Sequence, residues 1–191
     1  MQFRLCLLMV VAGGACHPVT RDHLLIETEL GDMVVEIESG KAPLTAAHFL
    51  SLVEEGVYNG SCFYRVVRLD NQPLNQVKIE VIQGGVLEDS LVERYPVIPH
   101  EPTSVTGISH TDGVISMARN QPGTASTEFF ICVGDQPSLD FGGKRNPDGQ
   151  GFAAFGRVIR GMEVVRTIQH QSDSSQMLRQ PVRILEIRRL D

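Results

Sequence analysis

Three patterns in this sequence contain residue types that carry chemistry in other proteins. Residues 149–154 (GQGFAA) match the GxGxxA pattern of dinucleotide-binding turns, but they lead into a strand-like run instead of opening a helix. Ser109 and His110 place a nucleophile beside a base, yet no GxSxG turn surrounds the serine, and sequence neighbours rarely face each other as a triad requires. The 6 histidines stand singly, without HExxH or CxxC. We therefore expect no metal and no cofactor.

Five other blocks form a set. They are FYRVV (63–67), VIQGG (81–85), GVISMAR (113–119), STEFFIC (126–132) and FAAFGRV (152–158), the last followed by Gly161 and Met162. In order and rough spacing these blocks resemble the cyclophilin family of peptidyl-prolyl cis-trans isomerases, over about residues 24–190. Five blocks in one order are far more specific than any single block.

The resemblance implies an enzyme that rotates the peptide bond preceding proline in polypeptide clients. This rotation breaks a partial double bond, with a barrier of about 18–20 kcal/mol. At Xaa-Pro bonds the uncatalysed exchange takes tens to hundreds of seconds. No covalent bond is made, so a catalyst has only to bind the twisted amide better than either planar form.

The resemblance assigns roles to particular residues. Arg65 is the expected catalytic residue, because its planar donor fork would bond the prolyl carbonyl and lie against the proline nitrogen as its lone pair returns. Gln83 would hold the guanidinium in place, and the backbone of Arg119 would bond the carbonyl preceding proline. The remaining substrate-binding residues expected in the apolar socket and groove rim are Val81, Ala118, Asn120, Glu128, Phe130, Leu139 and Phe152.

The sequence departs from the family pattern at several positions. Counting back from Gln83 places Glu80 where many cyclophilins carry a large apolar residue. Val81 replaces the usual methionine, and Glu128 replaces a common glutamine. Ser138 stands at the tryptophan position linked to cyclosporin binding, so we expect weak cyclosporin sensitivity. An insertion, residues 69–76, is either a lip beside the groove or a longer hairpin.

Strand-like runs account for most of the chain. They cover residues 23–30, 33–38, 62–69, 77–82, 113–118, 129–133, 152–158 and 182–190. Gly31 and Asp32 form the expected turn of a first hairpin. Thr45 is the expected N-cap of a helix that ends at Gly56, and a second helix is expected over residues 162–169.

Many strands, two helices and no βαβ rhythm predict a mainly β fold, an antiparallel closed barrel with helices covering its ends. With the resemblance, this becomes an eight-stranded cyclophilin-like barrel with two capping helices. A chain of 191 residues without internal repeats fits a single such domain, residues 23–191.

The N-terminus has the three-part form of a secretory signal. A basic start precedes an apolar run over residues 5–11 and small residues up to position 15, and the run is too short to span a bilayer, which takes about 20 residues. Residues 1–15 are therefore the predicted signal peptide, and residues 16–22 a short linker. Cys16 follows as in a bacterial lipoprotein, so lipidation at Cys16 and ordinary cleavage to a soluble form both stay open. Either outcome predicts an exported, periplasmic protein, with a membrane tether in the first case.

The expected partners are proline-containing polypeptide clients. A net charge of -6 argues against nucleic acid, because phosphate binding needs a basic face. We expect a monomer. The alternative to an isomerase acting on exported clients is a cyclophilin-fold chaperone or adaptor, which would bind proline-containing segments with little turnover.

Overall fold

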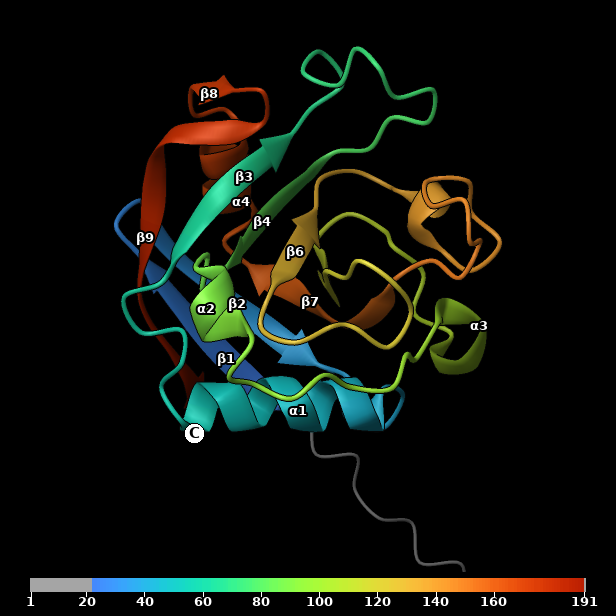
Figure 1. Cartoon of the computed structure of the whole chain (residues 1–191). Coiled ribbons are helices and arrows are strands. Elements are labelled where there is room, and N and C mark those ends of the chain that lie inside the picture. The colour runs from blue at the N-terminus through green and yellow to red at the C-terminus, as the bar shows by residue number, and fades with distance from the viewer. Residues whose placement is uncertain (1–21, 191) are drawn as a thin grey trace, which may run out of the picture.

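Eight strands within the described residues, 22–190, close into an antiparallel barrel in this computed structural model (Figure 1). They are β1 (Asp22–Thr28), β2 (Gly31–Ile37), β3 (Cys62–Val67), β4 (Val81–Gly85), β5 (Val114–Met117), β6 (Phe129–Cys132), β7 (Ala153–Arg160) and β9 (Met177–Leu190). Their order is β1-β2-β7-β5-β6-β4-β3-β9, and β9 pairs again with β1. A two-residue strand, β8 (Asp173–Ser174), pairs with the beginning of β9. The predicted fold class is confirmed.

Among residues 22–190, two longer helices pack on the barrel. Helix α1 (Pro43–Glu54) runs beneath it in Figure 1, and α4 (Met162–Gln169), with the predicted bounds, lies behind β3. Both contribute to the main core, through Phe49 of α1 and Ile168 of α4, for example. Short helical turns that the sequence did not predict lie in the loops of the described part of the chain: α2 (Asp89–Val92), α3 (Thr103–Thr106) and a 3-10 turn, η1 (Pro137–Leu139).

The two faces of β6 belong to different cores. Successive side chains of a strand point to opposite faces. Phe129 and Ile131 therefore join the core inside the barrel, whereas Phe130 and Cys132 join a second apolar cluster. The other buried members of the second cluster are Val67, Ile79, Val81 and Leu139. The barrel thus has an interior core that is separate from the apolar surface on the outer side of β6.

The first hairpin turns earlier than predicted. Thr28 pairs with Gly31, so Glu29 and Leu30 form the turn and Gly31 already belongs to β2. The Thr28 hydroxyl accepts a hydrogen bond from the Leu30 N–H at 3.2 Å and donates one to the Gly31 carbonyl at 2.7 Å. A threonine side chain that closes a turn in this way competes with the expected Gly-Asp turn.

The N-cap prediction for α1 is also wrong. The helix begins at Pro43, which suits a first turn because its missing N–H has no helical partner there. Thr45 lies inside the helix, and its N–H and hydroxyl both donate to the carboxylate of Glu101, at 2.6 and 2.7 Å. Glu101 is buried and lies 56 residues away in sequence, so local sequence gave no sign of this cap.

The strands next to the insertion are also shifted. We expected strands over residues 62–69 and 77–82, but β3 ends at Val67 and β4 begins at Val81. Gln72, almost fully buried, donates to the carbonyls of Arg68 at 2.8 Å and Ile79 at 2.7 Å. The Gln72 carboxamide thus bonds backbone carbonyls that would otherwise accept hydrogen bonds from a neighbouring strand. Residues 68–80 therefore form a loop, at the top of Figure 1.

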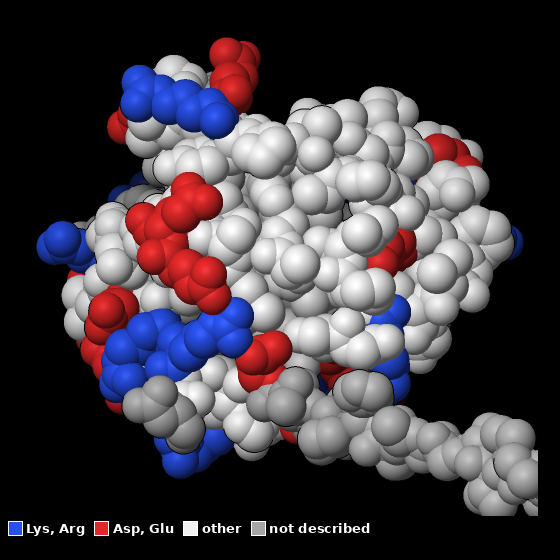
Figure 2. Space-filling view, turned by 90° about the horizontal axis from the view of Figure 1, so that it is seen from below, with Lys and Arg blue, Asp and Glu red and all other residues white. Residues whose placement is uncertain are grey.

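The face that carries α1 presents charges of both signs. Figure 2, which shows the molecule from below, has blue and red side chains next to one another. A broad uncharged area lies between the clusters of charged residues. Arg189 illustrates the mixture, because it forms ion pairs with Asp22 and with Glu54, the latter at 2.8 Å. Within the described residues, no helix is long and apolar enough to cross a membrane. The predicted signal peptide, Cys16 and most of the linker lie outside the described residues.

Candidate functional site

A groove of about 430 Å³ lies along the outer side of β4 and β6. Each residue predicted to be catalytic or substrate-binding lines it: Arg65, Val81, Gln83, Ala118, Arg119, Asn120, Glu128, Phe130, Leu139 and Phe152. The structure thus brings together residues that lie up to 87 positions apart in sequence, from 65 to 152. Their individual roles stay predictions.

Arg65 is held in the groove by two carboxamides. Its Nη1 donates to Oε1 of Gln83 at 2.8 Å, as the resemblance implies. Its Nε and Nη2 both donate to Oε1 of Gln176, at 3.1 and 2.6 Å. Both acceptors are neutral, and among the described residues no carboxylate forms an ion pair with Arg65. Burial lowers the pKa of Arg65, but a guanidinium keeps its charge at neutral pH.

The second carboxamide comes from a turn that the sequence did not single out. Gln176 follows β8 and has a φ of 75°, a left-handed conformation that is uncommon for residues other than glycine. Its N–H donates to Asp173 at 2.9 Å, and its own amide nitrogen donates to the carbonyl of Asn71 at 3.2 Å. This turn therefore connects the insertion to the arginine. Only the proximity of residues 65 and 176 in space reveals it.

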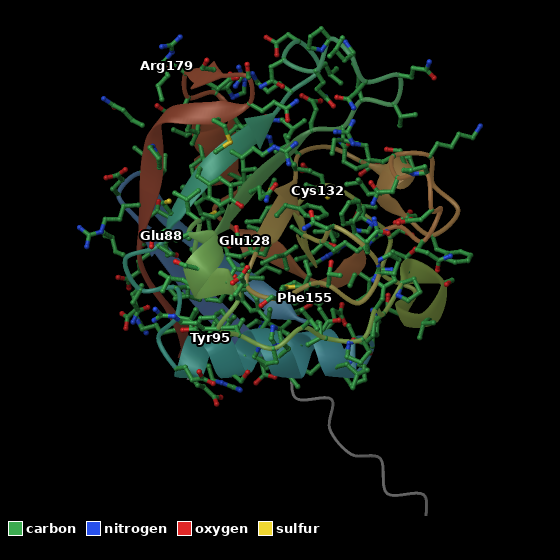
Figure 3. The ribbon with its side chains drawn as sticks, in the orientation of Figure 1. Glu88, Tyr95, Glu128, Cys132, Phe155 and Arg179 are labelled. Atoms are coloured by element: carbon green, nitrogen blue, oxygen red, sulfur yellow. The ribbon has the colours of Figure 1, made fainter. Side chains whose placement is uncertain are left out.

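A chain of hydrogen bonds leads from Arg65 to Glu128. Nε2 of Gln83 donates to the Tyr64 hydroxyl at 2.8 Å, and that hydroxyl donates to Glu128. Burial, the charge of Glu128 and the hydrogen bond to it all raise the pKa of Tyr64, so the phenol stays protonated as a donor. Glu128 also accepts from the Val86 N–H at 2.8 Å, and Figure 3 shows its side chain beside α2.

Gly85 makes this position of Glu128 available. A Cβ atom placed on Gly85 would lie 2.3 Å from Oε1 of Glu128, and Gly85 has a φ of 149°. Both observations require glycine at this position. Gly85 thus serves the close approach of the Glu128 carboxylate to the backbone of β4.

The apolar part of the groove is a socket formed by Phe130, Val81, Leu139 and Phe152. The first three are at least 96% buried. Phe152 meets Phe130 edge to face, with ring centroids 5.3 Å apart and an interplanar angle of 89°. Edge-to-face contacts fix aromatic rings in one relative orientation. The socket therefore offers a preformed apolar surface of the kind that a proline ring needs.

Ile79, not Glu80, supplies the apolar wall at this end of the groove. Ile79 is buried in the second cluster and lines the groove, whereas Glu80 does neither. Counting back from Gln83 places both Glu80 and Val81, and of these two only Val81 lines the groove. The alternation of an extended chain places 79, 81 and 83 on one side.

The side chain of Arg119 is bonded to other groups of the protein and is not available to bind a charged group of a ligand. It lies 5.1 Å from the Phe152 ring centroid and is paired with Asp148 at 2.8 Å. Its Nε also donates to the Gly151 carbonyl at 2.9 Å. With its charge neutralised and its side chain 1% exposed, Arg119 supports Phe152 from behind. Its backbone is the part left to meet a ligand, as the resemblance implies.

His110 takes part in a buried arrangement behind the socket. Nδ1 lies 2.7 Å from Asp140, Nε2 lies 3.0 Å from the Ser116 hydroxyl, and the ring stacks on Phe130. These are the residue types of a nucleophilic triad. However, Ser116 is fully buried and does not line the groove. No substrate reaches this hydroxyl, so the arrangement supports the socket.

Several residues that line the groove or hold Arg65 were not predicted, and Tyr64, Ile79, Arg145 and Gln176 are the ones that bear on its chemistry. Ile79 could have been found, because alternation from Val81 and Gln83 indicates its side. Alternation would place Tyr64 on the face opposite Arg65, and it lines the groove beside Arg65 where the register of β3 shifts between Phe63 and Arg65. Arg145 lies in the glycine-rich loop of residues 141–151, and nothing in that loop's sequence indicates a groove.

Comparison with known proteins places the chain among isomerases. The family model described as cyclophilin type peptidyl-prolyl cis-trans isomerase matches residues 23–189. A peptidyl-prolyl cis-trans isomerase of Acinetobacter baylyi is 31% identical over 187 residues, which covers 93% of this chain and 92% of that protein. Peptidyl-prolyl cis-trans isomerase B of Escherichia coli is 34% identical over 143 residues, covering 74% of this chain and 80% of the relative.

Solved structures agree on the fold. A cyclophilin type peptidyl-prolyl cis-trans isomerase of Cryptosporidium parvum has a TM-score of 0.69 and 22% identity, and it covers 90% of this chain and 99% of its own. A second structure, described under the same protein name and determined in the presence of the dipeptide Ala-Pro, has a TM-score of 0.67 and 23% identity. It covers 88% of this chain and 99% of its own. At this level of identity the likeness concerns the fold alone.

Proposed function

The chain belongs to the cyclophilin-type peptidyl-prolyl cis-trans isomerases, and we propose that it acts on exported proteins, rotating their Xaa-Pro bonds in the groove around Arg65. The observation that carries the proposed site is a guanidinium without a carboxylate partner among the described residues, fixed by Gln83 and Gln176 beside a preformed apolar socket. The Ala-Pro dipeptide used with one neighbour supports proline-containing segments as the ligand.

In the proposed mechanism, the proline ring occupies the socket of Phe130, Val81, Leu139 and Phe152, which excludes water from one side of the bond. The backbone of Arg119 holds the carbonyl preceding proline. Arg65 bonds the prolyl carbonyl and lies against the proline nitrogen, whose lone pair returns as the amide twists. The cation therefore stabilises the twisted amide more than either planar form, and this difference lowers the barrier.

An assay of cis-trans exchange in a prolyl tetrapeptide tests the role of Arg65. Arg65→Ala should lower kcat/KM about 100-fold, because removing one preorganised donor at a site of developing charge costs about 10²–10³ in rate. Arg65→Lys keeps the charge but loses the fork, so its rate should lie between the two. Circular dichroism serves as the control for folding.

Equal rates for wild type and Arg65→Ala would overturn this mechanism. Peptide binding by the wild type without measurable exchange would instead favour the chaperone or adaptor, which the acidic Glu128 in the groove leaves open for basic clients.

Export is proposed from the N-terminal sequence, in which a basic start, a short apolar run and small residues precede Cys16. Lipidation of Cys16 would tether the groove to a membrane. Expressed in a bacterium that processes lipoproteins, the protein should carry lipid on an N-terminal Cys16 in mass spectra and sediment with membranes. Cys16→Ser should release it into the soluble fraction. An unmodified Cys16 would contradict the tether, and an intact residue 1–15 segment in the cytoplasm would contradict export.

A further inference from the structure

Arg145 is a second cation in the groove, and the proposed mechanism does not use it. It lies in the loop that follows η1 and lines the groove together with Ile79 and Leu139. Its Nη1 donates to the Val77 carbonyl at 2.6 Å and to Oε1 of Gln72 at 3.1 Å. These bonds attach the Arg145 loop to the insertion, but both acceptors are uncharged.

The charge of Arg145 is not neutralised within residues 22–190. No ion pair to it is present there, and the same is true of Arg65. Two other guanidinium groups that are mostly shielded from solvent are paired with carboxylates: Arg119 with Asp148 and Arg68 with Asp173. The difference is not a shortage of acids, since the chain carries 23 acidic and 17 basic residues. The groove thus keeps two cations available.

Burial makes an anion at this position favourable. Arg145 is only partly exposed, and both burial and the neighbouring charge of Arg65 lower its pKa. A guanidinium in such surroundings gains more from a carboxylate than an exposed one, because screening by water is weaker. Its planar donors also match the two oxygens of a carboxylate.

The register of β4 places the charged residues in order along the groove. Glu128 bonds the backbone just beyond Gly85 at one end of β4, and Arg65 pairs with Gln83 in the middle. Arg145 lies at the other end, beside Ile79. One end of the groove is therefore acidic, and the other is basic.

The direction of a bound client follows from the proposed function, on which this inference rests. The Ala118 N–H bonds the Glu128 carbonyl at 2.8 Å, so the backbone of Arg119 lies toward the acidic end. That backbone is proposed to hold the carbonyl preceding proline. Residues before proline thus extend toward Glu128, and residues after proline extend toward Arg145.

We propose that Arg145 forms a subsite for a carboxylate on the carboxyl side of proline, so that the enzyme favours clients with Asp or Glu among the three residues after proline. Gln72 and Val77 hold Arg145 in place through one nitrogen, Nη1. Within the described residues, Nε and Nη2 have no hydrogen-bond partner of their own and are available to a ligand.

The test uses capped prolyl peptides in matched pairs, with Glu or Gln at the first, second or third residue after proline. At one of these positions at least, wild type should show a kcat/KM ratio of Glu over Gln of about 3 to 10. This corresponds to a partly exposed ion pair of about 1 kcal/mol. The ratio should fall as salt is added. Glu placed before proline should show no such advantage.

Variants assign the preference to Arg145. Arg145→Gln should bring the Glu/Gln ratio to about one, and Arg145→Lys should keep part of it. Arg179→Gln removes the same charge from an exposed site on β9, outside the groove and labelled in Figure 3, and should leave the ratio unchanged. If Arg145→Gln proves unstable, the Glu/Gln ratio of the wild type and its dependence on salt still test the subsite.

The outcomes separate this inference from the function on which it rests. Exchange of all peptides with a ratio near one at every position would overturn the subsite and leave the isomerase mechanism intact. A ratio above one that survives Arg145→Gln would assign it to another cation and overturn the role of Arg145. Absence of exchange with every peptide would overturn the proposed site at Arg65 itself.

Discussion

At the scale of single residues, the charged side chains that line the groove decide which ligand groups it can attract. Within residues 22–190 the Arg65 side chain is bonded only to neutral carboxamides, so its charge is available to a ligand in the groove. A carboxylate in the place of Gln83 or Gln176 would neutralise it and compete with the prolyl carbonyl. The use of amides as acceptors fixes the guanidinium without reducing its field.

Glu128 should select for basic residues before proline, because it lies at the end of the groove toward which these residues extend. Wild type should favour Lys over Gln two residues before proline by about 3-fold in kcat/KM, and Glu128→Gln should remove this preference. An exposed ion pair of a few tenths to 1 kcal/mol gives this size. The measurement is the exchange rate of the two matched peptides.

The control for this prediction is Glu88→Gln. It removes one negative charge from an exposed residue next to α2 that does not line the groove (Figure 3). A preference for Lys that persists in Glu128→Gln would contradict the role of Glu128. A preference that disappears in Glu88→Gln as well would show that the overall charge decides.

At the scale of elements, the turn from β8 to β9 is part of the proposed catalytic arrangement. It presents Gln176 to Arg65 and is itself fastened by Asp173, which accepts from the Gln176 N–H and from Arg68. Burial alone would raise the pKa of Asp173, but these hydrogen bonds outweigh it and lower that pKa. The carboxylate therefore stays ionised at neutral pH and holds the turn.

Gln176→Ala should lower the rate without unfolding the protein. The two hydrogen bonds from Arg65 to this amide are lost, so the guanidinium samples more orientations, and we expect kcat to fall about 5-fold with KM nearly unchanged. A loss of about 1 kcal/mol, typical of a hydrogen bond at a partly exposed site, corresponds to this factor.

Gln176→Asn, which keeps the amide, should recover part of the rate if it reaches Arg65. The melting temperature of Gln176→Ala, compared with that of the wild type, shows whether Gln176 has a purely structural role. If Gln176→Ala lowers stability while kcat stays at the wild-type value, then Gln176 supports the turn and does not position Arg65.

At the scale of the whole molecule, the residues that stabilise the barrel and the residues that line the groove lie on opposite sides of the sheet. The interior core contains Phe49, Tyr58, Phe63, Phe129 and Phe155 in mutual contact, and Figure 3 shows Phe155 within the barrel. The groove lies on the other side of β6 and is surrounded by loops. Changes in these loops, such as the insertion at 69–76, therefore leave the core packing intact while altering what meets the substrate.

The sequence by itself determined the fold class and the residues that gather around the groove. Alternating apolar residues set the strands, and the motif blocks marked Arg65, Gln83 and Phe130 because each block is local and each has a fixed side-chain direction within its strand. The helix over 162–169 was likewise readable from its own periodicity.

Only the tertiary structure decided which distant groups complete the site. Gln176 reaches Arg65 across 111 positions, Glu101 caps α1 across 56, and Arg145 meets the insertion across 68 to the Val77 carbonyl. These contacts depend on how loops fold over the finished barrel. Because loop residues follow no period of 2 or 3.6, their partners are fixed by closure of the barrel, and sequence patterns carry no record of them.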